Sequence, residues 1–255
     1  MNTRTHFTPL NRAESGHVLR IAHRGASAYA QENSAESFQK AAELGADMVE
    51  IDIRLTADGL PVVCHDESLT RLYGVSANIA DLTFDQLQAV IPAGRAPILT
   101  FETVAAACAD LKLGLYLDIK EFNLASGKII FAALDKFGLT AHSIAGSFRP
   151  DFAANIKAAH PRLRTSILYG STHIDPVLLA RAVSADYVHP CWENAASQPH
   201  RLLTPEWMEK VRAANLGIVC WHEERPAEIT ALDALGVDAI CSDTPDILFN
   251  LTANH

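Results

Sequence analysis

The chain of 255 residues has few basic side chains, few aromatic ones and no long apolar run. Lysine and arginine together number 21 against 30 aspartates and glutamates, which gives a net charge of −9. Proteins that bind nucleic acid or an anionic membrane surface need basic patches, so this balance argues against both partners. No run approaches the roughly 18 apolar residues of a membrane-spanning helix, and we therefore expect no stable membrane insertion.

Cysteine is also scarce, and its five residues form no C-x-x-C pair. This odd number does not predict a disulfide framework. Residues 1–18 lack the apolar core of a secretory signal peptide, and we expect them to form a loose N-terminal arm. Free thiols without a signal peptide favour a cytoplasmic location.

What the sequence does contain is a regular alternation of β-rich segments and amphipathic helical patterns. Eight β-rich segments begin near residues 19, 48, 114, 143, 165, 187, 217 and 238. Eight strand–helix units in a chain of this length predict an α/β fold, the (β/α)8 TIM barrel, as a single domain over 19–255. Because no glycine-rich dinucleotide loop follows the first strand, an open doubly wound sheet is disfavoured. Residues 57–100 then form a small insertion after the second barrel strand, at the barrel mouth.

The first outer helix has a recognisable start. Asn33 is a good N-cap residue, and Glu36 follows three positions later as a capping-box partner. We therefore expect the helix to begin directly after Asn33.

The segment 48–66 carries the most informative polar pattern. Period 2 places Glu50 and Asp52 on one face of a strand whose other face is apolar. The dipeptide Asp-Gly at 58–59 predicts a two-residue hairpin turn, and that register pairs Asp52 with His65. Two carboxylates beside a histidine suit a hard-metal site with a proton carrier. A solvated strand face explains this segment equally well on its own, because exposed acids are the rule.

In a (β/α)8 barrel, the side chains at the carboxyl ends of all strands meet at one mouth. The polar or aromatic residues at these positions are His23, Arg24, Glu50, Asp52, Asp118, Lys120, Ser147, His189, Trp221, His222, Glu223 and Asp243. The carboxylates suit Mg²⁺ or Ca²⁺, Arg24 and Lys120 suit phosphate oxygens, and His23 and His65 suit proton transfer. Ser147 lacks the G-x-S-x-G pattern of a nucleophile and is better explained as structural. The set predicts a metal-assisted phosphoester reaction.

Several of these motifs together resemble the glycerophosphodiester phosphodiesterase family. They are His23-Arg24-Gly25-Ala26, Glu32-Asn33-Ser34, Val49-Glu50-Ile51-Asp52, His65-Asp66, Leu117-Asp118-Ile119-Lys120 and the ending Ser242-Asp243-Thr244-Pro245. The similarity runs from about residue 19 to 249. The resemblance implies a TIM barrel that hydrolyses glycerophosphodiesters, such as glycerophosphocholine and glycerophosphoethanolamine, to sn-glycerol 3-phosphate and an alcohol. Either water or the glycerol 2-hydroxyl would attack phosphorus, the latter giving a cyclic phosphate.

The resemblance also implies roles for individual residues. One divalent ion, Mg²⁺ or Ca²⁺, would be held by Glu50, Asp52 and Asp118, and the catalytic residues would be His23 and His65. Phosphate or substrate would be bound by Arg24, Lys120 and Trp221, with Glu32 and Asp66 supporting the site from behind. Position 118 is Asp where the family usually has Glu, so the shorter side chain would reach the metal by a strand shift or through water.

The residues after Trp221 depart from the family pattern, because His222 and Glu223 stand where Thr-Val is usual. We expect Trp192, His222 and Glu223 to shape the pocket for the alcohol half, since an acidic, aromatic wall suits a cation such as choline. Ordinary rim residues are the alternative.

Two other functions fit the same barrel. One is a related phosphodiesterase with another substrate, a lysophospholipase D or a sugar phosphodiesterase. The other is a non-catalytic phosphate-binding barrel, which the presence of both His23 and His65 disfavours, because binding alone requires no proton carriers.

Overall fold

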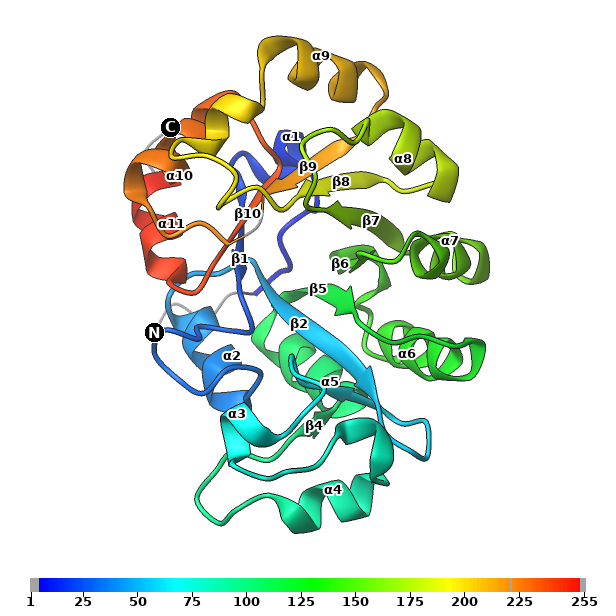
Figure 1. Cartoon of the computed structure of the whole chain (residues 1–255). Helices are drawn as coiled ribbons and strands as arrows, with labels where there is room; N and C mark the ends of the chain where they lie inside the picture. The colour runs from blue at the N-terminus through cyan, green and yellow to red at the C-terminus, as the bar shows by residue number, and fades with distance from the viewer. Residues whose placement is uncertain (1–4, 221, 253–255) are drawn as a thin grey trace.

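The computed structural model describes residues 5–220 and 222–252. Eight parallel strands form its centre: β1 (Leu19–Ala22), β2 (Met48–Leu55), β5 (Gly114–Ile119), β6 (Ser143–Ser147), β7 (Arg164–Tyr169), β8 (Tyr187–Pro190), β9 (Gly217–Cys220) and β10 (Ala239–Ser242). The ring closes because β1 pairs with both β10 and β2 (Figure 1). The predicted (β/α)8 barrel is confirmed.

Helices surround the ring on its outside (Figure 1). They are α2 (Ala35–Glu43), α5 (Phe101–Leu111), α6 (Leu124–Lys136), α7 (Pro150–Ala159), α8 (Pro176–Val183), α9 (Pro205–Ala213), α10 (Pro226–Leu235) and α11 (Pro245–Thr252). Five of these begin with proline, whose fixed φ and missing N–H suit the first helical position. Alternation along each strand sends one set of apolar side chains outward against the helices and the other into the barrel.

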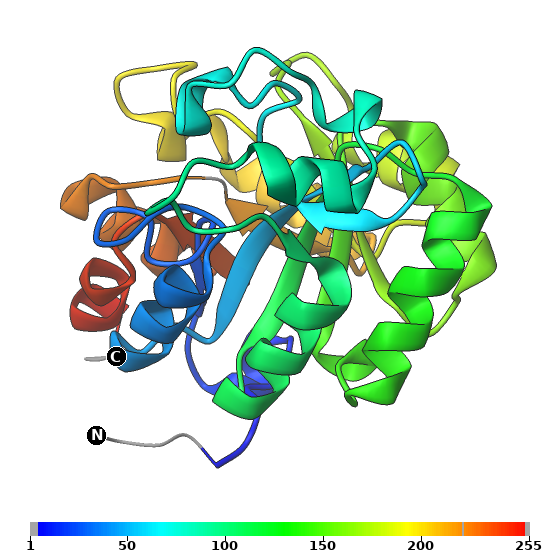
Figure 2. The same ribbon diagram turned by 90° about the horizontal axis from the view of Figure 1, so that it is seen from below.

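The insertion comprises β3 (Pro61–Val63), α3 (Thr70–Tyr73), the 3₁₀ turn η1 (Ile79–Asp81), α4 (Phe84–Val90) and β4 (Leu99–Thr100). Strand β3 runs antiparallel to β2 and pairs with β4. A small core of its own holds this layer together, built from Val62, Cys64, Leu69, Tyr73, Ile79, Leu87 and Ile98. Figure 2 shows the insertion at one end of the barrel and the N-terminal segment at the other.

The N-terminal segment is not loose over its described part, so this expectation is wrong. Leu10 is buried with the side chains that fill the barrel interior, and its carbonyl accepts a hydrogen bond of 2.9 Å from the Tyr187 hydroxyl. After it comes α1 (Arg12–Ser15), from which Arg12 forms a 2.8 Å ion pair with Asp233. The segment therefore closes the end of the barrel that lies opposite the mouth.

The predicted hairpin register is wrong by one residue. Ile53 lies opposite Val63, which places Asp52 opposite Cys64 rather than His65. The reason is the turn: the N–H of Gly59 donates to the Thr56 carbonyl at 2.8 Å, and Gly59 has a φ of 77°. This is a three-residue loop with a left-handed glycine, one residue longer than the predicted turn. His65 consequently reaches the mouth from the loop that follows β3.

The expected N-cap is also displaced by one residue. Ser34 caps α2, because its Oγ accepts from the N–H of Ser37 at 3.1 Å and its own N–H donates to Ser37 Oγ at 3.2 Å. Asn33 instead adopts a φ of 56° and donates from Nδ2 to Asp52 at 3.0 Å. Its side chain therefore binds Asp52 at the barrel mouth and does not cap the helix.

Candidate active site at the barrel mouth

Three carboxylates meet inside the mouth. Glu50 and Asp52 extend from β2 and Asp118 from β5, with Asp52 directly opposite Asp118 in the strand register. All three are fully buried, and one oxygen from each lies within 4.8 Å of the others. A solvated strand face is therefore excluded for these residues.

Two cations lie against this acid cluster, which we define as Glu50, Asp52 and Asp118. Lys120 Nζ lies 2.5 Å from Asp118 and 3.2 Å from Asp52, while Arg24 Nε lies 3.4 Å from Asp52. The backbone N–H of Arg24 donates to Glu50 at 3.0 Å. Among the described residues, Glu50 thus accepts a hydrogen bond from the backbone of Arg24 but from no cationic side chain, and its charge is the least compensated of the three.

Burial and neighbouring charges shift the pKa values of the three carboxylates in different directions. Burial, together with the charges of Asp52 and Asp118, raises the pKa of Glu50 well above its usual range. Burial also raises the pKa of Asp118 to about 6, against the opposing charge of Lys120. For Asp52, Lys120 and Arg24 overcome burial and hold the pKa below its usual range. When all three carboxylates are ionised, they exceed the two cations by one negative charge, which another cation would relieve.

The cluster fits a divalent metal ion. Glu50 Oε1 and Asp118 Oδ1 are buried and accept no hydrogen bond from the residues the structure describes. Buried acceptors without donors are costly, and several carboxylate oxygens converging on one point are the ligands that Mg²⁺ and Ca²⁺ prefer. The shorter side chain of Asp118 still reaches the cluster, because β5 pairs directly with β2 at this position.

His23 follows β1 and points into the same mouth. Its Nδ1 lies 2.7 Å from Asp243 and its Nε2 lies 3.9 Å from Glu50. A carboxylate can only accept, so Nδ1 carries the proton and Nε2 is left as the acceptor. Burial lowers the pKa of His23, although the bond to Asp243 opposes this, and the ring is therefore neutral near pH 7.

Asp243, which follows β10, fixes this arrangement. It also accepts hydrogen bonds from Ser27 Oγ at 2.8 Å and His222 Nε2 at 2.9 Å. Against the effect of burial, the hydrogen bonds from His222 and His23 hold the pKa of Asp243 far below its usual range. The sequence places Asp243 at a strand end but assigns it no role. The closure of β10 on β1 brings it beside His23.

The second histidine is held by the insertion. His65 Nδ1 lies 2.8 Å from Asp66, whose other oxygen lies 2.5 Å from Arg71 Nε. Arg71 also forms two bonds of 2.7 Å with Glu32, and Glu32 lies 3.1 Å from Arg24. Alternating charges thus connect His65 to the acid cluster. Glu32 and Asp66 thus both contact Arg71, which the sequence does not single out because it lies on α3 of the insertion.

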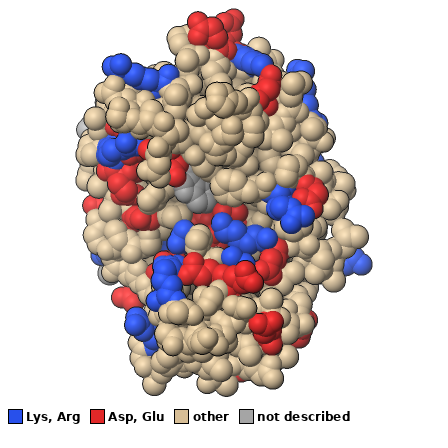
Figure 3. Space-filling view, viewed as in Figure 1, with Lys and Arg blue, Asp and Glu red and all other residues tan. Residues whose placement is uncertain are grey.

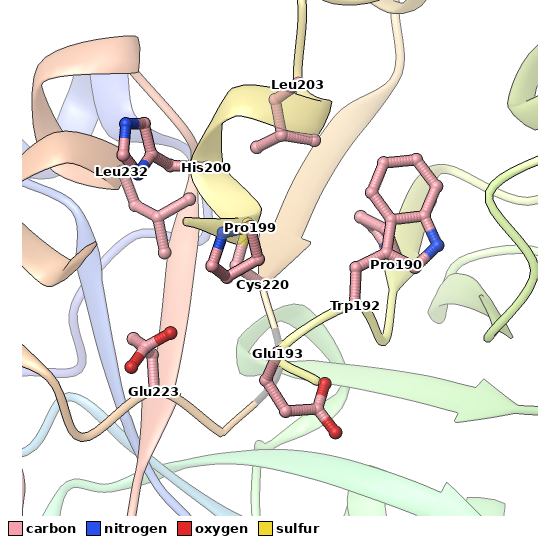
Figure 4. Close-up of a pocket in the computed structure, with 9 residues that line it drawn as sticks. All are labelled: Pro190, Trp192, Glu193, Pro199, His200, Leu203, Cys220, Glu223 and Leu232. Carbon is pink, nitrogen blue, oxygen red and sulfur yellow. The ribbon is translucent and has the colours of Figure 1, made fainter. Parts of the chain in front are cut away.

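Of the residues expected to shape a pocket, Trp192 after β8 and Glu223 after β9 line a common small cavity (Figure 4). Glu223 is buried and receives bonds of 2.7 and 2.6 Å from the Arg225 guanidinium, so it presents no free negative charge. Trp192 packs edge-on against Tyr169 and Trp207, each with a ring separation of 5.8 Å. Trp221 lies outside the described residues.

Two other strand-end residues are structural. Ser147 Oγ donates to the Ile119 carbonyl at 2.7 Å and accepts from the Arg149 N–H at 3.1 Å, which agrees with its predicted structural role. His189 is buried, with Nδ1 2.6 Å from the hydroxyl of Tyr116. Burial lowers the pKa of His189 to about 3, so the ring is neutral and forms part of the floor of the mouth.

Seen from the mouth, acidic and basic side chains gather near the centre of the face (Figure 3). Among the described residues, no helix is long and apolar enough to cross a membrane. The face combines buried oxygen ligands, fixed cations and two oriented histidines, which is a set suited to a phosphate ester.

Comparison with known proteins agrees with this geometry. The model of the "glycerophosphoryl diester phosphodiesterase family" matches residues 23–247. A glycerophosphodiester phosphodiesterase of Caldanaerobacter subterraneus is 30% identical over 251 residues, which cover 92% of this chain and 97% of the relative.

Solved structures share the fold. A glycerophosphodiester phosphodiesterase from Thermotoga maritima superposes with a TM-score of 0.75 at 24% identity, covering 92% of this chain and 99% of that one. An Oleispira antarctica phosphodiesterase, solved in complex with the product sn-glycerol-3-phosphate, superposes with a TM-score of 0.77 at 21% identity, covering 94% and 98%.

Proposed function

Because the chain belongs to the glycerophosphoryl diester phosphodiesterase family and is thereby an enzyme that hydrolyses phosphoric diesters, we propose that it cleaves glycerophosphodiesters to sn-glycerol 3-phosphate and an alcohol. Glycerophosphocholine and glycerophosphoethanolamine are the substrates we propose. The product complex of the Oleispira antarctica neighbour supports sn-glycerol 3-phosphate as one product. Five free cysteines support a reducing, cytoplasmic location.

The observation that carries the proposal is the acid cluster with its unsatisfied buried oxygens beside His23. A structural cluster of three buried carboxylates would cost stability, because their desolvation and mutual repulsion exceed what two cations return. We therefore attribute the close packing of Glu50, Asp52 and Asp118 to a role in catalysis and not to stability.

These three residues would hold one divalent ion, Mg²⁺ or Ca²⁺. When bound, such an ion supplies Lewis-acid stabilisation of charge on the phosphate oxygens. Arg24 and Lys120 lie beside the same carboxylates, and we assign to them the remaining phosphate oxygens, with Trp221 contributing to substrate binding.

We assign proton transfer to the two histidines. His23 is neutral, with Nδ1 protonated toward Asp243 and Nε2 as the acceptor nitrogen, and it suits the base that takes the proton of the attacking hydroxyl. Asp243 holds its tautomer, as a hydrogen-bonded carboxylate does for histidine bases in hydrolases. His65 is half-exposed and supported by Asp66, and it suits the acid that protonates the leaving alcohol.

The test is phosphate-ester hydrolysis by protein stripped of metal and then supplied with Mg²⁺, Ca²⁺ or Mn²⁺. We expect sn-glycerol 3-phosphate from glycerophosphocholine and glycerophosphoethanolamine only after metal is restored. Parallel reactions with lysophosphatidylcholine and a sugar phosphodiester separate the related activities, because faster turnover of either would replace the proposed substrate. No hydrolysis of any diester would leave a phosphate-binding barrel.

A further inference from the structure

His222 has no part in the proposed mechanism, although it lies beside the proposed base. It follows β9, Asp243 follows β10 and His23 follows β1, and these three strands are neighbours in the ring. The carboxyl ends of the parallel strands of a barrel meet at one mouth, so the three side chains come together there. Asp243 is the middle member of this set, because both histidines bind it.

The two oxygens of Asp243 are divided between the two histidines. Oδ1 lies 2.7 Å from His23 Nδ1 and accepts from Ser27 Oγ at 2.8 Å, whereas Oδ2 lies 2.9 Å from His222 Nε2. A carboxylate can only accept, so His222 donates from Nε2 whether its ring is neutral or protonated. His222 therefore occupies the oxygen that His23 does not use.

This second bond matters because the Asp243 side chain is not enclosed. It is 34% exposed, so water competes for its oxygens, and the torsion that rotates a carboxylate is a soft one. A donor on Oδ2 restrains that rotation and keeps Oδ1 toward His23. The rings of His222 and His23 are also in contact, with centroids 4.9 Å apart and planes inclined by 50°. His222 thus restrains both the base and the carboxylate that orients it.

The backbone of His222 is itself in an unusual conformation. Its φ is 38°, in the left-handed region that residues other than glycine seldom adopt. Such a conformation is costly and persists where the surrounding structure enforces it. Glu223 supplies that constraint, because its N–H donates to the Cys241 carbonyl at 2.8 Å and its carboxylate binds Arg225. An unfavourable φ maintained beside the proposed base indicates a role for the His222 side chain in the reaction.

We propose that His222 is a positioning residue that holds Asp243 and His23 in the geometry of the reaction. Its bond to Oδ2 keeps the Nδ1 proton of His23 on the other oxygen of Asp243, which leaves Nε2 on the side of Glu50, 3.9 Å away. This inference rests on the proposed function, in which His23 is the base. It differs measurably from a role of His222 in the alcohol pocket. A pocket residue changes KM and distinguishes between alcohols, whereas a positioning residue changes kcat for every alcohol.

The experiment separates the hydrogen bond from the ring. His222→Phe keeps an aromatic ring and removes the donor, and His222→Gln removes the ring and keeps an N–H donor. The matched control is His17→Phe, because His17 Nε2 makes a similar bond of 3.0 Å to Asp47 at the end of the barrel opposite the mouth. Thermal unfolding shows whether each variant is folded.

Two readouts are needed. The first is kcat and KM of the metal-loaded enzymes for glycerophosphocholine and glycerophosphoethanolamine. The second is nitrogen-15 NMR of the imidazole rings at pH 8 in Mg²⁺-loaded protein without substrate, which reports the tautomer of His23. The His23 signals are identified by their absence from the spectrum of His23→Asn. The tautomer does not depend on turnover of a diester.

For His222→Phe we expect kcat to fall by about 10-fold for both diesters with KM within about 2-fold of wild type, together with a mixture of His23 tautomers. Wild type, His17→Phe and His222→Gln should hold the Nδ1–H tautomer, with kcat values within about 3-fold of one another. The inference would be overturned, and the proposed function left intact, by a folded His222→Phe with wild-type kcat, by a change in KM for one diester alone, or by an equal loss in His222→Gln. Hydrolysis of neither diester by the metal-loaded wild type would overturn both.

Discussion

Removing the charge of Glu50 should make the metal-free protein more stable, and we expect this of Glu50→Gln. One oxygen of Glu50 lies within 4.8 Å of oxygens of both Asp52 and Asp118. At an effective dielectric constant of 20, each such pair costs about 3.5 kcal/mol when both groups are ionised. Arg24 and Lys120 offset part of this repulsion, since both lie against the same cluster. A net gain of about 2 kcal/mol is therefore expected from the isosteric amide.

The assay is thermal unfolding at pH 8, where carboxylates are most strongly ionised. In the presence of a chelator, about 2 kcal/mol corresponds to a rise in Tm of about 4–8 °C for a domain of this size. Addition of Mg²⁺ at about 100 times its Kd should stabilise wild type by about 2.7 kcal/mol and Glu50→Gln by much less. Bound Mg²⁺ and the Glu50→Gln substitution thus both relieve the repulsion among the carboxylates of the acid cluster.

A suitable control is Glu102→Gln, because Glu102 is 55% exposed on α5 and its ion-pair partner among the described residues is the exposed Lys136. Its Tm should not change, and its response to Mg²⁺ should equal that of wild type. A lower Tm for Glu50→Gln in chelator, or an equal Mg²⁺ response, would refute the view that the cluster is strained without metal.

Other predictions concern the loops and the outer layer. Gly25 has a φ of 81°, and an added Cβ would lie 2.2 Å from Ser37 Oγ. Gly25→Ala should cost about 2–4 kcal/mol in urea unfolding, whereas Gly94→Ala, with a φ of 86° and open space, should cost only about 1 kcal/mol. Equal losses would show that the close contact is unimportant. Asp186, despite burial, has a pKa held below its usual range by Lys157 and the Thr165 N–H. Its contribution is complete above the unfolded pKa of about 3.9 and is lost as pH falls through the lower folded pKa, so Asp186→Asn should cost about 1–2 kcal/mol at pH 7 and progressively less below about pH 4. A loss that is independent of pH would contradict this.

The barrel itself follows from the sequence because its signals are local and repeated. Each strand is a short β-rich run followed by an amphipathic helix, and closure requires only eight such units. The positions of Glu50 and Asp52 inside the barrel follow from period 2 along β2. Period 2 alone does not tell whether Glu50 and Asp52 face the barrel interior or solvent. Pairing of β2 with β5, which carries Asp118, places them in the interior.

Each error in prediction has a specific physical cause. One extra residue in the turn around Gly59 shifts the hairpin, because a left-handed glycine permits two loop lengths. Asn33 matches a helix cap by type, but Asp52 competes for its amide. The N-terminal segment looks polar, yet Leu10 enters the open end of the barrel and Arg12 pairs with Asp233. The contacts of Asn33 and of the N-terminal segment link residues far apart in the chain, and no local pattern encodes them.

The central claim is that His23 and His65 transfer protons during hydrolysis at this mouth. The most direct measurement is the rate of sn-glycerol 3-phosphate formation from glycerophosphocholine, followed by phosphorus NMR, for wild type, His23→Ala and His65→Ala. All three proteins must be metal-loaded and shown to be folded by thermal unfolding. We expect each substitution to reduce kcat by at least about 100-fold, the usual contribution of a general acid or base. Folded variants that retain wild-type kcat, or a wild type that releases phosphocholine instead, would contradict the account.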